Sequence, residues 1–186
     1  YDYSKIYQPI KLDYLKSSYS FMTLLDKEIE LQKDDLAFFN NDESVINFAG
    51  IVGGKNTSCD NKTKSVIVEC AHFDPEAIIG KAIKHDINSE AAYRFERFVD
   101  PESHDYVLRR MLHIVNNHTK IRQIKLLNEN FLEIKSNPIP FNIKDINKIL
   151  GTNICEEDCF KYLKRLGFEI VEDKINIPSY RNDIKN

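Results

Sequence analysis

The sequence lacks the features that mark disordered, fibrous or membrane-spanning chains. It contains no tryptophan and only 6 glycines and 6 prolines, while 42% of its 186 residues are hydrophobic and 30% are charged. That composition is typical of a folded globular protein. No stretch approaches the roughly 18 continuous apolar residues of a membrane span. The chain opens with Tyr1 rather than with methionine or a signal-like segment, so we expect a piece of a longer protein without membrane contact.

Cysteine is scarce, and its spacing does not predict a metal site. The four cysteines include no CxxC pair and no neighbouring histidine at a zinc-finger spacing. Cys155 and Cys159 lie four residues apart on a predicted helix, where they would share a face, but packing is the commoner reason for such a pair. We therefore expect free thiols and a reducing cytoplasm.

An excess of positive charge is also missing. The 26 lysines and arginines are outnumbered by 29 aspartates and glutamates, which gives a formal net charge of -3. Unspecific binding to a phosphate backbone draws most of its free energy from many lysines and arginines that displace counterions. Any contact with nucleic acid must therefore be local, and DNA binding is not expected.

The first third of the chain predicts short strands. Residues Phe21–Leu25 and Ile29–Leu31 flank the polar pair Asp26-Lys27 and predict a hairpin, which Leu36–Phe39 follows. After a polar turn over residues 40–44, another apolar run begins at Val45. A β-branched run over residues 65–70 predicts a further, buried strand.

The best candidate site in the residues themselves is a glycine-rich turn beside that last strand. Three glycines within Gly50–Gly54 predict backbone with positive φ or backbone that a ligand approaches closely. Glu69 ends the apolar strand, where a carboxylate is costly to bury without a partner. It either pairs with an internal group, which is the commoner case, or meets a ligand donor. The residues alone predict an α+β domain with a glycine-lined pocket.

Two helix starts follow, at Asp74-Pro75-Glu76 and Asp100-Pro101-Glu102, because each offers a capping carboxylate, a proline in the first turn and an acid behind it. Residues 88–99 between them are expected to be extended or loop. Apolar stripes predict the buried face of each helix: Ile79, Ile83 and Ile87 in the first, and Val107, Leu108, Met111, Leu112 and Val115 in the second.

Other polar residues of this region are expected to be structural. His72 and His85 have no serine or cysteine near them in a nucleophile motif, so each is interpreted as a satisfied polar side chain. Arg94, Glu96 and Arg97 resemble an ion-pair ladder more than a catalytic set.

A domain boundary is predicted at about residue 130, which separates domains of residues 1–130 and 131–186. In the second domain, Ile143–Leu150 and Cys159–Leu166 predict helices that end at Gly151 and Gly167, and a hairpin follows over residues 168–177. Two helices and a hairpin predict a small winged-helix-like α+β unit. Its acidic residues are as numerous as its basic ones, which argues against DNA binding.

Several stretches resemble, in order and spacing, the bacterial phenylalanyl-tRNA synthetase beta subunit. Three of them resemble the signature of its editing domain: AGIVGG at residues 49–54, VECAHFDPEAI at 68–78 and SEAAYRFERFVDP at 89–101. Two more, LKRLGFEI at 163–170 and PSYRNDI at 178–184, resemble its next domain. The resemblance covers nearly the whole chain and implies an editing domain, with a mixed or antiparallel sheet packed with helices, followed by the small second domain.

The resemblance implies a hydrolytic site for tyrosine wrongly attached to tRNA(Phe). Matching motif positions put Gly50 and Gly53 on the floor of that site, and Glu69 at the glutamate that recognises the tyrosine hydroxyl. Ser89 stands where relatives commonly have threonine, and Ala91 matches a small residue that leaves room for the substrate ring. A positioned water would attack the ester, so no catalytic side chain is assigned.

The partners and cofactors that the resemblance implies belong to the whole enzyme. They are tRNA(Phe), an alpha subunit that carries aminoacylation within an α2β2 assembly in the cytoplasm, ATP and magnesium. No cofactor is expected in this piece, although Asp183 matches the first of several acidic magnesium ligands. The alternative interpretation is a non-catalytic RNA-binding or subunit-assembly module with a degenerate editing pocket.

Three positions depart from the pattern of the family. Tyr1-Asp2 align with the last two residues of a His-Ala-Phe-Asp run, so its histidine falls before the chain begins. Phe98 stands where the family usually has glycine, which requires a local rearrangement if that glycine has positive φ. The acidic partners of Asp183 would lie beyond Asn186, and one carboxylate alone holds magnesium poorly.

Overall fold

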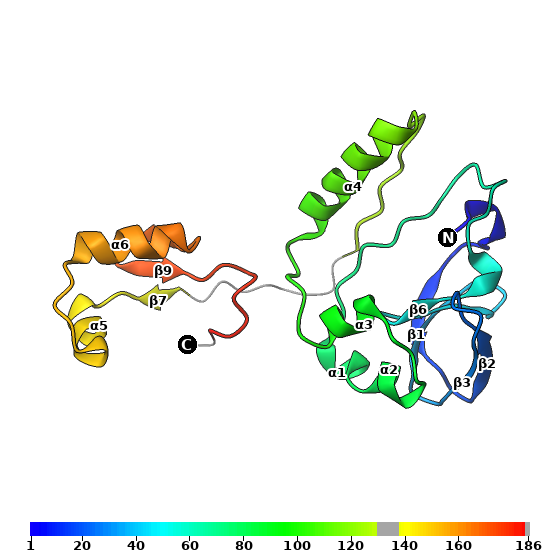
Figure 1. The fold of residues 1–186 in the computed structure, drawn as a ribbon, viewed down its shortest axis with the longest axis horizontal. Coiled ribbons are helices and arrows are strands. Elements are labelled where there is room, and N and C mark those ends of the chain that lie inside the picture. The colour runs from blue at the N-terminus through cyan, green and yellow to red at the C-terminus, as the bar shows by residue number, and fades with distance from the viewer. Residues whose placement is uncertain (130–137, 185–186) are drawn as a thin grey trace. The chain divides into compact units, whose positions relative to one another are not determined.

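A computed structural model describes residues 1–129 and 138–184. The chain divides into two compact units, Tyr1–Leu108 and Arg109–Asn186 (Figure 1). Antiparallel sheets and helices make up both units, so the prediction of an α+β protein is confirmed. The predicted boundary at about residue 130 lies outside the described residues and stays a prediction. No helix in the described ranges is long and apolar enough to cross a membrane.

The first unit is built on a four-stranded antiparallel sheet and a separate hairpin. The sheet has the order β1-β4-β5-β6, and the hairpin pairs β2 with β3 in a register that sets Tyr19 opposite Leu31. The predicted hairpin is thus confirmed, with its first strand two residues earlier than expected. The bounds are β1 Lys11–Tyr14, β2 Tyr19–Met22, β3 Glu28–Leu31, β4 Leu36–Phe39, β5 Val45–Phe48 and β6 Val52–Gly53, with short 3-10 helices at Tyr3–Lys5 and Lys55–Thr57.

Alternation of polar and apolar residues determines which face of a strand packs against the core. In β3, Ile29 and Leu31 are buried while Glu28 and Glu30 are exposed, as expected for a strand with one solvated face. Strand β5 is different, because three of its four residues are buried and Asn47 is its only polar member. The central position of β5 in the unit therefore places one amide side chain next to the core.

The prediction of a buried strand over residues 65–70 is wrong. This segment is extended but forms only one antiparallel bridge, between Val66 and Asp2. Val66 and Val68 are 56% and 47% exposed. The β-branched residues favour an extended backbone, but a strand needs ladder partners. Among the described residues, Tyr1 and Tyr3 exchange backbone hydrogen bonds with Ile67 and Ser65, on either side of the Asp2–Val66 bridge.

The first predicted helix is broken in two. Asp74 caps α1, Pro75–Ile78, by accepting a hydrogen bond from the Glu76 amide at 3.0 Å, which confirms the predicted start. Gly80 then takes a φ of 76° and ends the first turn before α2, Lys81–Lys84. Because the helix is interrupted at Ile79 and Gly80, the predicted isoleucine stripe is wrong for Ile79 and Ile83, which are 57% and 79% exposed, whereas Ile87 is buried as expected.

Two further corrections concern the segment after α2. A helix, α3, spans Glu90–Phe95, where an extended or loop segment was predicted. Its missed signal is Ser89 followed by Glu90, a capping hydroxyl ahead of an acid in the first turn. Helix α4 spans His104–His118 and so begins later than predicted, and none of its residues is buried, so its expected core stripe is wrong in the described residues. In Figure 1, α1, α2 and α3 lie together beside the sheet of the first unit.

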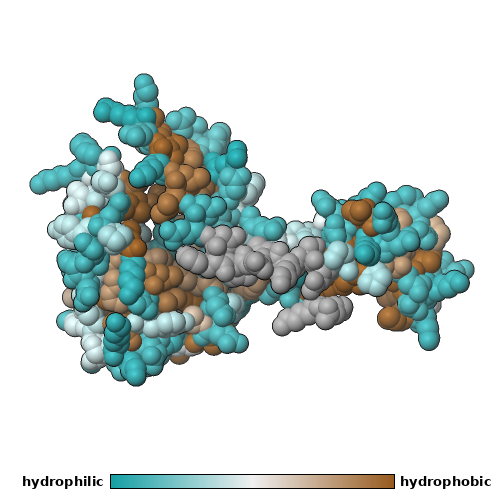
Figure 2. Space-filling view, turned by 180° about the vertical axis from the view of Figure 1, so that it is seen from behind, coloured by the Kyte–Doolittle hydropathy of each residue, from teal (hydrophilic) through white to brown (hydrophobic). Residues whose placement is uncertain are grey.

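The second unit confirms the predicted order of helix, helix and hairpin. Gly151 and Gly167 have φ values of 64° and 84° just after the two helices, as their predicted role as stops requires. A short edge strand joins the hairpin in the order β7-β9-β8, and Ile170 pairs with Ile175. The bounds are β7 Ile139–Pro140, α5 Ile143–Leu150, α6 Glu156–Arg165, β8 Glu169–Val171 and β9 Lys174–Asn176. Both units keep some hydrophobic side chains on the face drawn in Figure 2.

A buried carboxylate joins the sheet of the first unit to α2. The Asp35 side chain is fully buried, receives a 2.5 Å hydrogen bond from Lys81 Nζ and lies 3.3 Å from His85 Nε2. The Gln32 amide donates to its other side at 2.8 Å. Burial by itself raises the pKa of Asp35, but the hydrogen bonds from Lys81 and Gln32 outweigh it and hold the pKa below the ordinary 3.8. His85 is thus a satisfied polar residue, as predicted.

We expect Asp35→Asn to lower the free energy of unfolding by about 3 kcal/mol at pH 7, because it leaves the Lys81 ammonium without its counter-charge. A lowered carboxyl pKa stabilises the folded state above the ordinary pKa of 3.8 and ceases to do so as the pH falls through the folded value. The loss should therefore shrink in urea unfolding below pH 3.8. Asp34→Asn, at the exposed neighbouring position, is the control. Equal losses for both variants would contradict this role of Asp35.

Candidate functional site

The glycine-rich turn between β5 and β6 is shaped by its own chain. Gly50 has a φ of 70°, and a Cβ there would lie 2.8 Å from Cδ1 of Ile78. At Gly54, a Cβ would lie 2.8 Å from the carbonyl oxygen of Ile46, which cannot move away. A Cβ at Gly53 would meet only the end of the Leu24 side chain, at 2.9 Å. Positive φ is thus confirmed at Gly50, and close approach comes from the core and the backbone.

The side chains of Tyr1, Asn47 and Glu69, which are far apart in the sequence, form one hydrogen-bonded cluster. The Tyr1 hydroxyl donates a hydrogen bond to Oε2 of Glu69, and Asn47 Nδ2 donates both to that hydroxyl and, at 3.0 Å, to the same Oε2. Asn47 belongs to β5 and pairs with Gly53 of β6. The structure therefore links Glu69 to Gly53 through Asn47.

The surroundings of Glu69 raise the pKa values of both the carboxyl and the neighbouring phenol. Burial by neighbouring atoms raises the pKa of the Glu69 carboxyl, although hydrogen bonds from Tyr1 and Asn47 oppose the shift and part of the side chain reaches solvent. Burial, and then the adjacent Glu69 charge, raise the pKa of the Tyr1 phenol far above its ordinary value of 10.0. The phenol is consequently a hydrogen-bond donor throughout the physiological pH range.

Ser89 and Ala91 lie at the start of α3. The Ser89 hydroxyl donates to the carbonyl oxygen of Ile51 at 2.5 Å and accepts from the Ala92 amide at 3.2 Å. It therefore fastens the first turn of α3 to the glycine-rich turn. Ala91 is exposed and lies two residues beyond the capping residue Ser89. Gly50 and Gly53 thus belong to the glycine-rich turn, to which Ser89 is hydrogen-bonded through Ile51. Glu69 is linked to the same turn through Asn47.

Sequence reasoning missed Tyr1 and Asn47 as members of this cluster. Asn47 carries a usable signal, since it is the one polar residue within a strand that is otherwise buried, and buried amides need partners. Its Oδ1 atom is buried and has no partner among the described residues. Tyr1 has no such signal, because its contact with Glu69 spans 68 positions of sequence.

Phe98 departs from the family pattern and keeps a backbone conformation that suits glycine. Its φ is 77°. Its ring meets the His72 ring edge to face, with centroids 5.8 Å apart. His72 Nε2 is buried without a partner in the described part of the chain, and burial lowers its pKa. The prediction that His72 is a satisfied polar residue is therefore wrong for this nitrogen.

The expected ion pairs of the same region are present. Arg94 lies 3.3 Å from Glu90 on α3, and Arg97 lies 3.7 Å from Glu96. Arg97 also stacks over the Tyr93 ring at 3.8 Å. These contacts confirm the predicted ion pairs of Arg94, Glu96 and Arg97.

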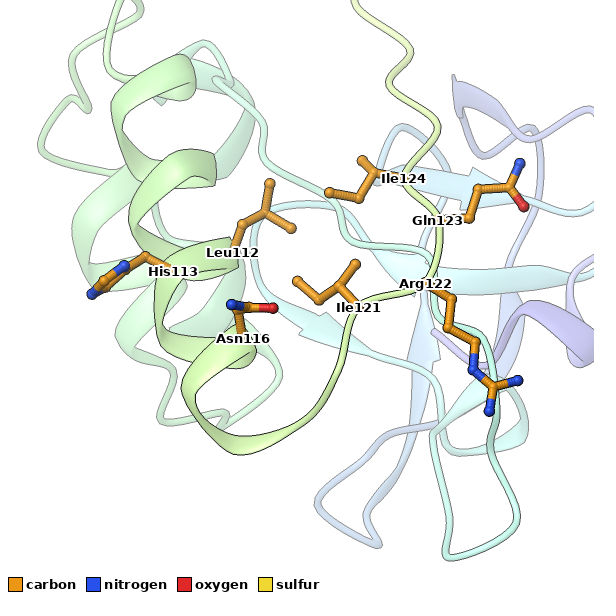
Figure 3. A pocket seen from close by; sticks show the side chains of 7 residues that line it. All are labelled: Leu112, His113, Asn116, Ile121, Arg122, Gln123 and Ile124. Atoms are coloured by element: carbon orange, nitrogen blue, oxygen red, sulfur yellow. The ribbon is translucent and has the colours of Figure 1, made fainter.

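Two surface hollows are present among the described residues, and neither is lined by Tyr1, Asn47 or Glu69. One is lined by α4 and the segment after it, where Leu112, Ile121 and Ile124 point inward and His113 points away (Figure 3). The other is lined by Ser18, Ser20 and residues 28–30 of the hairpin. Neither includes a residue that the sequence assigned to the site.

A metal site is not formed by the residues that the structure describes. No three side chains among histidine, cysteine, aspartate and glutamate gather there to hold an ion, and the four cysteines are free thiols. Asp183 forms a two-pronged pair with Arg181, with distances of 2.7 and 2.8 Å. Arg181 lowers the pKa of that carboxyl. These residues do not fit magnesium on their own.

Comparison with known proteins identifies the class of protein to which the chain belongs. Residues 1–120 match the B3/4 domain and residues 139–186 match the tRNA synthetase B5 domain, so the chain is a two-domain segment of an aminoacyl-tRNA synthetase. More particularly, it belongs to the phenylalanyl-tRNA synthetase beta subunit family.

Individual relatives agree over most of this chain. The phenylalanine–tRNA ligase beta subunit of Idiomarina loihiensis is 30% identical over 170 residues, which cover 88% of this chain and 21% of that protein. The same subunit of Francisella tularensis is 29% identical over 194 aligned positions, which cover 100% of this chain and 24% of the relative. The chain thus spans about a quarter or less of the length of these curated relatives.

The conformation of Phe98 allows a direct test of backbone strain. Phe98→Gly and Phe98→Ala both remove the ring that contacts His72, but only the glycine variant also removes the Cβ. We expect the glycine variant to be about 1 kcal/mol more stable than the alanine variant, because the left-handed region is costly for residues with a Cβ. Urea unfolding of the two variants measures this difference. An alanine variant as stable as the glycine variant would contradict a positive φ at this position.

Proposed function

We propose that this chain carries the site that hydrolyses tyrosine wrongly attached to tRNA(Phe). The main observation in support is that the Glu69 carboxylate accepts a hydrogen bond from a phenolic hydroxyl, which belongs to Tyr1. A carboxylate with this geometry has the chemistry needed to recognise the hydroxyl that distinguishes tyrosine from phenylalanine. The family to which the chain belongs supports the same assignment.

Glu69 suits this task because no described lysine or arginine pairs with it, although the charge of the N-terminal ammonium lowers the pKa of its carboxyl. Of the described residues, no lysine or arginine forms an ion pair with its carboxylate, and both of its donors are neutral groups. A site that hydrogen-bonds a hydroxyl discriminates strongly against the analogue that lacks it, because the polar group of the site would lose its partner. Glu69 would thereby spare the correct phenylalanyl ester.

The glycine-rich turn and Ser89 would shape the remainder of the site. Gly50 and Gly53 would form its floor, Ser89 would hold α3 against that floor through Ile51, and Ala91 would leave room for the ring. A positioned water would attack the ester carbonyl, so that binding and orientation supply the catalysis. No side-chain nucleophile is assigned.

The partners of the whole enzyme follow from the same proposal. The complete beta subunit would assemble with an alpha subunit into an α2β2 enzyme that binds tRNA(Phe) and uses ATP and magnesium in the cytoplasm. Asp183 would be one of the acidic magnesium ligands of the complete subunit, after release from Arg181. The editing step proposed for this chain is not routed through that ion.

A non-catalytic RNA-binding or assembly module is the second candidate. Phe98 favours it, because a bulky ring stands at a position with positive φ and covers His72. A non-hydrolysable tyrosyl-adenosine ester analogue separates the two functions. A working site should bind this analogue more tightly than the phenylalanyl counterpart, whereas a degenerate site should bind both equally.

Glu69→Ala in the complete beta subunit, assembled with its alpha subunit, tests the proposed function. We expect hydrolysis of tyrosyl-tRNA(Phe) to fall about 10- to 100-fold, because a hydrogen bond to a charged group is lost in the transition state. Deacylation assays on the tyrosyl and phenylalanyl esters measure the effect.

Glu30→Ala is the matched control, since Glu30 is an exposed glutamate of the same unit on β3. It should leave both rates unchanged. Normal discrimination by Glu69→Ala would refute the role proposed for this residue.

A further inference from the structure

The hydrogen bonds at Glu69 all reach one of its two oxygens. The Tyr1 hydroxyl and Asn47 Nδ2 both donate to Oε2, and Asn47 also donates to the Tyr1 oxygen, which closes a three-membered ring of hydrogen bonds. Oε1 receives no hydrogen bond from the described residues. The carboxylate is therefore fixed in orientation with half of its acceptor capacity unused.

Tyr1 is itself held firmly enough to act as a fixed support. Its backbone nitrogen donates to the Ile67 carbonyl at 2.9 Å, and the Ile67 amide donates back to the Tyr1 carbonyl at 2.9 Å. These bonds join Tyr1 to the segment that carries Glu69, two residues further on. The phenol thus reaches the carboxylate from a backbone that the same segment holds in place.

Asp2 anchors the next residue. Its buried carboxylate accepts hydrogen bonds from the Thr63 hydroxyl at 2.6 Å and from the Ser4 hydroxyl and amide at 2.7 and 2.9 Å. These bonds hold the pKa of Asp2 at about 2, so the carboxylate stays ionised and bonded. Tyr1 is thereby fixed on both sides, through Ile67 and through Asp2.

Asn47 provides the second support from the centre of the sheet. It lies in β5, between Ile46 and Phe48, which are both almost fully buried. Its pairing with Gly53 fixes its backbone within the ladder. The amide consequently approaches Glu69 from the glycine-rich turn, and the phenol approaches from the N-terminal segment.

We propose that Tyr1 is a positioning residue for substrate specificity, which acts with Asn47 by holding Oε2 of Glu69 so that Oε1 accepts the hydroxyl of a tyrosyl ester. This inference rests on the proposed function and deepens it. A carboxylate with two free oxygens rotates, and its orientation entropy must be lost when substrate binds. Two prior hydrogen bonds on one oxygen remove that cost in advance.

The hydrogen bonds from Tyr1 and Asn47 to Oε2, which we call the clamp, also affect the pKa of the Glu69 carboxyl. Hydrogen bonds from Tyr1 and Asn47 lower the pKa of Glu69, against burial, which raises it. Removing the Tyr1 hydroxyl should therefore let the pKa of Glu69 rise further. A pH profile reports this change, whereas a merely structural role of the hydroxyl would leave it unmoved.

Tyr1→Phe in the complete subunit, assembled with its alpha subunit, tests the clamp. This variant removes one hydroxyl and restores the residue of the His-Ala-Phe-Asp pattern, so it should fold. We expect kcat/KM for deacylation of tyrosyl-tRNA(Phe) to fall about tenfold, as for loss of one hydrogen bond to a charged group, with the phenylalanyl ester unaffected. The acidic midpoint of discrimination should move to higher pH. Tyr3→Phe, at an exposed tyrosine two residues away, is the control and should change neither quantity.

Comparison with Glu69→Ala separates the clamp from the proposed function. If Glu69→Ala abolishes discrimination while Tyr1→Phe leaves it unchanged, the clamp is refuted and the editing function stands. If Tyr1→Phe instead raises kcat/KM for the tyrosyl ester, the phenol occupies the place of the substrate, and the clamp is refuted again. If Glu69→Ala has no effect, the proposed function fails and the clamp fails with it.

Discussion

The candidate site depends on the hydrogen bonds that two neutral groups, the Tyr1 phenol and the Asn47 amide, donate to the Glu69 carboxylate. A lysine or arginine at hydrogen-bond distance would hold the charge in an internal pair and leave little to gain from a substrate hydroxyl. A phenol and an amide instead orient the carboxylate without neutralising it. Burial by neighbouring atoms raises the pKa of Glu69, and the hydrogen bonds from Tyr1 and Asn47 and the charge of the N-terminal ammonium oppose that shift.

The contrast with Asp35 shows that the same unit treats two carboxylates differently. Asp35 is fully buried, and Lys81, with support from the Gln32 amide, holds its pKa low, so that the charge serves to join α2 to the sheet. Glu69 forms no ion pair with a described lysine or arginine and keeps an acceptor oxygen without a described partner. The first unit thus contains one carboxylate held in an ion pair and another held only by neutral hydrogen-bond donors.

Local signals in the sequence predicted the elements whose causes are local. The hairpin around Asp26, the cap at Asp74 and the stops at Gly151 and Gly167 each depend on residues within a few positions, and the structure confirms them. The buried strand at 65–70 failed, because a ladder needs a partner that residues of the segment do not specify. The broken helix at Gly80 failed because a regular isoleucine spacing was given more weight than one glycine.

The residues of the candidate site likewise fall into those that the sequence indicates and those that only the fold brings together. The glycine-rich turn and Glu69 carry visible signals, and Asn47 carries a weaker one as an amide in a buried strand. The contact of Tyr1 with Glu69 joins positions 68 apart and follows only from the fold. Ser89 was assigned to the site through the family motif, whereas its hydrogen bonds to Ile51 and Ala92 emerged from the helix that the periodicity missed.

Phe98 is a bulky residue in a backbone conformation that favours glycine. Its φ of 77° is one that glycine adopts freely and that a residue with a Cβ adopts at a cost. The surrounding chain therefore determines the backbone at this position, and the ring is accommodated against His72 instead of forcing a new turn. The ring of Phe98 contacts His72, whereas the hydrogen bonds at Glu69 come from Tyr1 and Asn47, so Phe98 takes no part in the described hydrogen bonds of that cluster.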